Sequence, residues 1–268
     1  MTALPAIRLL DKPVGITSHD VVGRIRREYP KNTRVGHAGT LDPFASGLLL
    51  ILIGRATRTQ RFFMGLDKEY LVTAQFGATS STGDPEGEIT PTGNIPEGDL
   101  VLPLGPQDQI PPKYSALKVD GKRAYSLARA GEEFTLESRR INVTAFVEME
   151  RGQSTRDYRI RCSSGTYIRS LIGDLGDAYC TSLRRTEIGP FALPRGGDET
   201  LSLESALKLV MPEVGVTDDE ARLLGHGRKL EVTDVPEGTV VVQGPQGLVA
   251  IASVDADGVM SSLVGFVG

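Results

Sequence analysis

A single carboxylate, Asp42, stands just before the longest aliphatic run of the chain. It lies in the stretch VGHAGTLDPFASGLLLILIG (35–54), between Leu41 and Pro43. A charge without a partner is costly to bury. Asp42 therefore either caps a turn or is held at the edge of the core for chemistry.

The remaining motifs argue against several common site types. None of the three histidines, His19, His37 and His226, has a second histidine or a cysteine at metal-ligand spacing. A Ser-His-Asp triad would lack its G-x-S-x-G elbow, and neither a Walker A sequence nor G-x-G-x-x-G is present. GHAG is similar to the H-x-G-H of nucleotidyltransferases, but that chemistry needs two imidazoles and only His37 is here.

Six motifs, including the one that contains Asp42, occur in a fixed order along the chain. They are LLDKPVGITSHDVV (9–22), RVGHAGTLDPFASGLLL (34–50), LDKEY (66–70), PPKYSALKVDGKRAYSLARAG (111–131), RCSSGTYIRSL (161–171) and LRRTEIGPF (183–191). Together they resemble the bacterial tRNA pseudouridine-55 synthases, the TruB family, over residues 7–193. The resemblance implies an isomerase that breaks the C–N glycosidic bond of a T-loop uridine and rejoins the uracil through C5. It implies no cofactor and no metal.

The resemblance assigns three catalytic residues. Asp42 matches the catalytic aspartate, which attacks the substrate or assists departure of the uracil. Arg169 matches the arginine that pairs with this aspartate and keeps it ionised. Tyr70 matches the tyrosine expected to stack on the target uracil and to help the deprotonation at C5. These roles resolve the choice at Asp42 in favour of chemistry.

The resemblance also implies a substrate-binding group. His37 matches a histidine near the flipped nucleotide, and Tyr167 and Leu183 match positions that line the base pocket. Lys12 matches a motif lysine with a structural or phosphate-directed role. Asp84 aligns with an acid that orients Arg169.

The implied partner is the T-arm of tRNA. Five basic residues between 113 and 129 are the candidate phosphate contacts: Lys113, Lys118, Lys122, Arg123 and Arg129. Two segments beside them, EGDLVLPLGPQDQI and DAYCTS, are shorter than the family pattern. Because these deletions affect the grip on RNA more than the chemistry, a tRNA-folding chaperone with weak or no catalysis is the alternative function.

Charge is distributed unevenly along the chain. The formal net charge is −4, yet residues 1–63 carry ten Lys or Arg against four Asp or Glu. Residues 197–268 carry four basic and twelve acidic residues. Contact with RNA phosphates needs a local basic face and not a basic average, so the charge permits RNA binding.

The pattern of apolar residues and breakers predicts the elements that must position this site. Helices are expected at 19–29, with Ser18 as N-cap, and at 56–64, 166–179 and 202–210. Strands are expected at 6–10, 70–76, 141–150 and 156–163. A loop is expected over 89–112, and a hairpin turn at 120–121 followed by a helical turn.

Composition changes after residue 212. Residues 213–268 show a short helix and strands at 229–232, 239–243, 248–254 and 262–267, which predicts a small β-rich module that resembles a PUA domain. Residues 1–212 form the expected catalytic domain, with an RNA-gripping insertion at about 89–135. Helices and strands mix without βαβ regularity, so we expect an α+β protein with the pseudouridine synthase fold, a mainly antiparallel sheet with flanking helices.

The remaining features bear on location and assembly. Two cysteines form no disulfide framework, no signal peptide is evident, and the aliphatic run 48–53 is too short to cross a bilayer. The sequence therefore predicts a soluble cytoplasmic protein. The resemblance implies a monomer.

Overall fold

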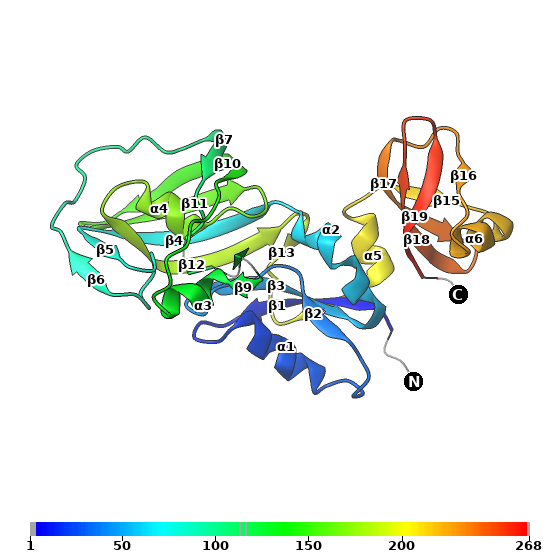
Figure 1. Cartoon of the computed structure of the whole chain (residues 1–268), viewed down its shortest axis with the longest axis horizontal. Coiled ribbons are helices and arrows are strands. Elements are labelled where there is room, and N and C mark those ends of the chain that lie inside the picture. Colours follow the sequence, from blue (N-terminus) through cyan, green and yellow to red (C-terminus); the bar gives the residue numbers. More distant parts are fainter. Residues whose placement is uncertain (1–3, 113, 116, 120, 267–268) are drawn as a thin grey trace.

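The chain forms a long mixed sheet flanked by helices and a smaller second sheet near the C-terminus (Figure 1). The structure is a computed structural model and describes residues 4–112, 114–115, 117–119 and 121–266. All strand pairs of the large sheet are antiparallel except β12 with β3. The expected α+β class and mainly antiparallel sheet are confirmed.

The large sheet has ten strands, eight of them in the order β14-β1-β3-β12-β4-β11-β10-β7, with β13 beside β12 and β2 beside β3. Their bounds are β1 Ala6–Lys12, β2 Val35–His37, β3 Ser46–Ile53, β4 Lys68–Phe76, β7 Gly105–Gln109, β10 Arg139–Arg151, β11 Thr155–Cys162, β12 Ala178–Ile188, β13 Phe191–Ala192 and β14 Glu199–Ser202. Two small hairpins pair β5 (Ala78–Ser80) with β6 (Ile89–Pro91), and β8 (Lys118–Val119) with β9 (Lys122–Arg123).

Strand β3 explains the aliphatic run after Asp42. Successive side chains of a strand point to opposite faces, and both faces of β3 are covered. Leu48, Leu50 and Leu52 pack in a cluster with helix α5 (Leu203–Lys208). The alternating residues from Leu49 to Ile53 pack against helix α1 (Ser18–Arg26). A strand buried on both faces is apolar throughout, so the run is core.

Helix α1 begins one residue earlier than the sequence predicts. Thr17, not Ser18, is the N-cap, and it forms a capping box with Asp20. Ser18 is buried, and its hydroxyl is hydrogen-bonded to both the backbone N–H and the carbonyl of Leu41. The expected cap residue therefore ties the helix to the loop that carries Asp42.

Other expected elements differ in extent. The helix predicted at 166–179 is only α4 (Ile168–Gly173), because residues from 178 onward join the sheet as β12. The loop predicted over 89–112 contains β6 and β7, and the helix at 56–64 is a 3-10 turn, η1 (Gly54–Thr59), followed by α2 (Gln60–Met64). The hairpin near 120 and α3 (Ala124–Arg129) follow the prediction at the residues described.

The second sheet has the order β15-β17-β18-β19-β16 and is covered by α6 (Asp218–Gly225). Its strands are β15 Glu213–Gly215, β16 Leu230–Glu231, β17 Gly238–Gly244, β18 Gly247–Val254 and β19 Val259–Gly265. Val241, Ile251 and Val264 share a hydrophobic cluster with Ile7 of β1 and with α5. The β-rich C-terminal module is confirmed, whereas its likeness to a PUA domain and the boundary at residue 212 stay predictions.

Candidate active site

The loop between β2 and β3 carries Asp42. Gly39 has a φ of +100°, which a residue with a side chain rarely adopts, and allows the loop to turn after β2. The carbonyl of Pro43 accepts a hydrogen bond from the Gly15 N–H at 2.8 Å. With Ser18 bonded to Leu41 on the other side, Asp42 is fixed from both flanks. Its side chain retains 36% exposure, so a substrate can reach it.

Arg169 on α4 is the cation that faces Asp42. Its Nε lies 3.0 Å from Asp42 Oδ2, and its Nη1 lies 3.0 Å from Asp84 Oδ2. Nη1 also donates to the Thr82 carbonyl at 2.6 Å, and Nη2 donates to the Tyr114 carbonyl at 2.9 Å. All three nitrogens are therefore engaged in a side chain that is 5% exposed. The expected Asp42–Arg169 ion pair and the contact between Asp84 and Arg169 are both present.

The electrostatics of this pair leave Asp42 reactive. Burial raises the pKa of the Asp42 carboxyl above its ordinary value, and repulsion from Asp84 acts in the same direction. The guanidinium of Arg169 and the ammonium of Lys12 oppose the rise in pKa. One guanidinium shared between two carboxylates cannot fully neutralise both. Asp42 is thus a partly desolvated carboxylate, which is a stronger nucleophile and base than one in water.

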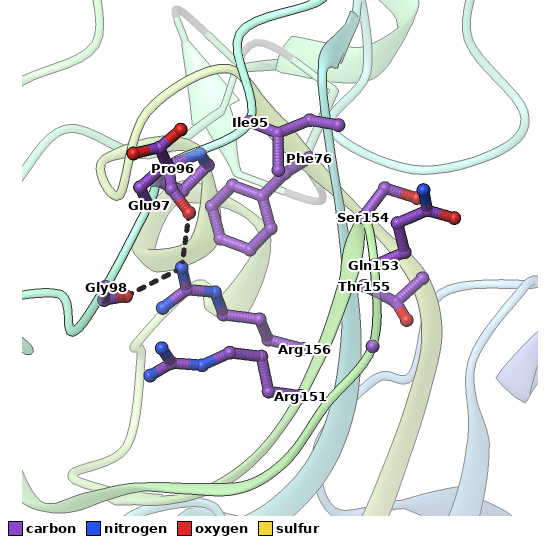
Figure 2. Close-up of a pocket in the computed structure, with 11 residues that line it drawn as sticks. Phe76, Ile95, Pro96, Glu97, Gly98, Arg151, Gln153, Ser154, Thr155 and Arg156 are labelled. Atoms are coloured by element: carbon purple, nitrogen blue, oxygen red, sulfur yellow. Dashed lines mark hydrogen bonds between the residues drawn. The ribbon is translucent and has the colours of Figure 1, made fainter.

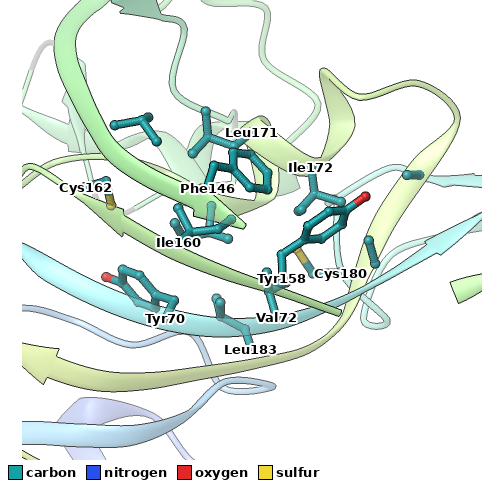
Figure 3. Packing of buried hydrophobic residues seen from close by; sticks show 14 of the residues in the cluster. Tyr70, Val72, Phe146, Tyr158, Ile160, Cys162, Leu171, Ile172, Cys180 and Leu183 are labelled. Atoms are coloured by element: carbon teal, nitrogen blue, oxygen red, sulfur yellow. The ribbon is translucent and has the colours of Figure 1, made fainter. Parts of the chain in front are cut away.

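Tyr70 and Leu183 lie on neighbouring strands, β4 and β12, beside this loop. Both belong to the buried cluster that includes Leu41, and Figure 3 shows the Tyr70 ring at the margin of that cluster. Burial raises the pKa of the Tyr70 hydroxyl, and Asp42 is close enough to add to the rise. Tyr70 is therefore a neutral, rigid aromatic surface next to the carboxylate.

His37 and Tyr167 are the two remaining aromatic residues of the predicted substrate-binding group. His37 lies five residues before Asp42, and Tyr167 lies two residues before Arg169. His37 ends β2, and burial followed by the charge of Arg185 lowers the pKa of its imidazole, which favours the neutral form. Tyr167 precedes α4, where its backbone N–H and carbonyl both bond to the Gln109 side chain, at 2.8 and 3.0 Å. Asp42 and Arg169 both influence the pKa of Tyr167, which burial raises.

Lys12 has surroundings that do not suit a phosphate contact. Its side chain is fully buried, and its ammonium donates to the carbonyls of Pro13, Ile16 and Pro43 at 2.9, 2.8 and 3.4 Å. Three donors matched by three carbonyls leave none for a ligand. The structural alternative is the one that fits, because Lys12 joins its own turn to the residue after Asp42.

Arg185, in the motif LRRTEIGPF, is a buried residue that was not among the predicted site residues. It is 1% exposed, and its guanidinium donates to the carbonyls of Leu48 at 2.8 Å, Gly39 at 3.2 Å and Thr40 at 3.4 Å. A Cβ on Gly47 would lie 2.2 Å from the Arg185 carbonyl oxygen, so only glycine fits between β3 and β12. Arg185 therefore fixes both ends of the loop that carries Asp42.

Of the basic residues expected to grip RNA, the structure describes only one side chain. Lys122 is exposed and lies 3.5 Å from Glu132. Lys113 lies outside the described residues, and for Lys118, Arg123 and Arg129 only the backbone is described. The contact between this segment and RNA stays a prediction.

A hollow of about 300 Å³ lies between the 95–98 segment and β11, and it does not include any residue of the Asp42 site. Figure 2 shows Arg156 in this hollow with hydrogen bonds to the carbonyls of Pro96 and Gly98. Arg151 and Arg156 also pair with Glu148. Within the described part of the chain, no group of three or more His, Cys, Asp or Glu could hold a metal, and no helix is long and apolar enough to span a membrane.

Comparison with known proteins places this geometry in a family. The family model for the N-terminal domain of TruB family pseudouridylate synthases matches residues 26–168. A protein named tRNA pseudouridine synthase B from Corynebacterium aurimucosum is 40% identical, covering 89% of this chain and 88% of its own. One of the same name from Mycobacterium ulcerans is also 40% identical, covering 97% and 90%.

A solved structure extends the likeness to the fold. The crystal structure of a Cbf5-Nop10-Gar1 complex contains a chain that superposes with a TM-score of 0.69 at 24% identity, covering 98% of this chain and 84% of that one. This likeness concerns the fold. The family model and the two relatives define the chain as a pseudouridylate synthase. The chain belongs to the TruB family of pseudouridylate synthases.

Proposed function

We propose that this protein converts a uridine of tRNA to pseudouridine, at position 55 in the T-loop, with Asp42 as the nucleophile. The observation that carries the proposal is the Asp42–Arg169 pair at 3.0 Å, beside the ring of Tyr70, in a member of this family. Relatives at about 40% identity over most of the chain are named tRNA pseudouridine synthase B. No observation favours the chaperone alternative.

Each side chain has a defined part in the reaction. The target uridine leaves the folded loop and enters the site, where His37, Tyr167 and Leu183 surround it and Tyr70 stacks on the uracil. Asp42 attacks while Arg169 holds its carboxylate in place and ionised. The C–N bond breaks and the uracil rotates. The bond from C1′ to C5 forms and the bond to Asp42 breaks, so that the carboxylate is restored. C5 then loses its proton and N1 of the uracil gains one. Substrate and product are isomers, so the reaction consumes no redox equivalent.

The test is to incubate the purified protein with an unmodified tRNA transcript and to map pseudouridine along it. We expect product at position 55 in the wild-type transcript and no product in a transcript with cytidine at that position. Tight binding of tRNA with no product would contradict the enzyme function. Product at another position would contradict the T-loop assignment. We further expect a cytoplasmic monomer, which light scattering of the purified protein checks for its mass of 28.8 kDa.

A further inference from the structure

A second hollow, of about 500 Å³, lies at the far end of α1 from Asp42. Its lining comes from the C-terminal turn of α1, the 31–34 segment, the start of β2 and η1. The polar residues of the lining are Arg26, Lys31, Asn32, Thr33, Arg34 and Thr57. We refer to it as the Lys31 hollow.

The charges around the Lys31 hollow are not neutralised by the protein. Arg26, Lys31 and Arg34 are exposed, and none has an ion-pair partner among the described residues. The four acids of residues 1–63 are all engaged elsewhere. Asp11 pairs with Arg184, Asp20 caps α1, Glu28 pairs with Arg8, and Asp42 pairs with Arg169. Three of the ten cations of residues 1–63 therefore line this hollow with no acid of the described chain to neutralise them.

The hollow rests on fixed backbone. The Thr33 N–H donates to the Pro30 carbonyl at 2.8 Å, and the Gly54 N–H donates to the Arg34 carbonyl at 2.8 Å. Arg26 is held over β2 by a bond of 3.3 Å from Nη2 to the Val35 carbonyl. The Thr33 hydroxyl is buried and has no hydrogen-bond partner in the described part of the chain, which is unusual for a polar group in this position.

Helix α1 links the hollow to the catalytic loop. Its first residue, Ser18, is bonded to Leu41 next to Asp42, and its last residue, Arg26, lines the hollow. Nine helical residues span about 13 Å. That distance equals a few base pairs of duplex at roughly 3 Å each. A nucleic acid with one nucleotide at Asp42 can therefore reach the hollow with its adjacent duplex.

We propose that the Lys31 hollow binds backbone phosphates of the duplex stem next to the target loop of the RNA substrate. The inference rests on the proposed function and adds a site that is separate from the base pocket and from the 113–129 segment. The ligand class is a phosphodiester, and recognition is independent of sequence because the three cations meet charge and not base edges. The hollow in Figure 2 is the contrast, since its arginines are already paired with Glu148.

The decisive experiment compares two double variants with the same change in charge. Lys31→Gln/Arg34→Gln removes two cations from the hollow. Arg24→Gln/Arg27→Gln removes two exposed cations, one on α1 and one at its C-cap, neither of which lines the Lys31 hollow. For the first variant we expect the KM for tRNA to rise about tenfold with kcat within about twofold. The slope of log affinity against log salt should become shallower by about 1.5. The second variant should change KM less than about twofold.

Each other outcome overturns the inference. Equal effects of both variants on the KM would show a general electrostatic attraction of RNA and no specific site. No effect of either variant would show that RNA does not contact the Lys31 hollow. A loss of affinity for single-stranded RNA but not for a hairpin would exclude the duplex stem. If the wild-type protein forms no product, the proposed function fails, yet fluorescence anisotropy with a labelled RNA hairpin still measures binding at the hollow in both variants.

Discussion

Two sets of charged groups lie around the loop that carries Asp42, and they differ in what neutralises their charges. In the first set, the carboxylates of Asp42 and Asp84 share the guanidinium of Arg169. The second set consists of Lys12, Lys68 and Arg185, which donate hydrogen bonds to backbone carbonyls. Arg185 also forms a hydrogen bond with the side chain of Tyr70. The Lys68 ammonium, for example, donates to the carbonyls of Met64 and Leu66.

The first set bears on the reactivity of Asp42, and the second bears on the rigidity of the backbone around it. Sharing one cation between two acids leaves Asp42 incompletely neutralised, and its pKa is raised. Cations bound to carbonyls instead hold backbone segments together, and burial lowers the pKa of both lysines. The first set therefore determines what the site can do, and the second determines where the loop lies. Variants of the two sets should therefore differ in whether they change the reaction or the stability.

The largest effect is expected at Asp42. Asp42→Asn keeps the shape of the side chain but removes the nucleophile, so kcat should fall at least about a thousandfold. The affinity for tRNA should stay within about threefold, measured by filter binding beside single-turnover kinetics. Asp11→Asn, at an exposed acid that pairs with Arg184, is the control and should leave kcat unchanged. Collapse of tRNA binding in Asp42→Asn would mean that this residue is structural.

Loss of Arg185 should affect stability first. Arg185→Met leaves the carbonyls of Gly39, Thr40 and Leu48 without their donor, and the free energy of unfolding should fall by about 3 kcal/mol. Urea denaturation measures the change. The matched control is Arg184→Met, because Arg184 is adjacent and 38% exposed, and its side chain bonds to Asp11 at the surface and to the Ser46 hydroxyl but to no backbone carbonyl of the described residues. We expect a loss below about 1 kcal/mol there. Similar losses in both variants would contradict the division between the two sets.

Asp84 should tune the pH dependence of the reaction. The reaction needs ionised Asp42, so kcat/KM should fall as the pH drops through a pKa that lies above the ordinary value of 3.8. Asp84→Asn removes the repulsion between Asp84 and Asp42 and leaves Asp42 as the only carboxylate among the described residues that pairs with Arg169. The pKa of Asp42 should therefore fall, and the acid limb of the kcat/KM profile should move to lower pH. The cost in kcat near pH 7 should be less than about tenfold. An acid limb that moves to higher pH would refute the shared-cation explanation.

The narrowest effect, confined to alkaline pH, is expected at Lys68, whose pKa is lowered to about 8 by burial and then by Arg185. The unfolded chain keeps this proton up to about pH 10.5, so between these values the unfolded state binds more protons and stability rises with pH. We expect a gain of about 2 kcal/mol from pH 8 to 10 relative to Lys68→Met, measured by urea denaturation. A gain of the same size in the variant would show that other groups are responsible.

The first set could be anticipated from the sequence, and the second could not. The resemblance to the TruB family implied that Asp42 and Arg169 pair across more than a hundred residues, and the structure places them in contact. Arg185 stands in the basic string LRRT, which is equally compatible with a surface that binds RNA. Its burial depends on the parallel pairing of β12 with β3, which local sequence does not encode.

Local signals failed for the same reason at the element ends. Ser18 and Thr17 are both good N-caps, and only the approach of the Leu41 backbone decides that Ser18 is buried. Residues 178–188 become strand β12 because β4 offers a partner along their whole length. Tertiary pairing overrides local preference in both cases.

The cluster that joins β1, α5 and the second sheet has a consequence for how the chain can be divided. Val241, Ile251 and Val264 lie against Ile7, and Arg58 donates to the Gly265 carbonyl at 2.7 Å. Removing the C-terminal module would strip the rear of the catalytic sheet to solvent. The module therefore has a core of its own and also covers apolar side chains of the catalytic domain, so cutting the chain between them would leave both sides of this contact exposed.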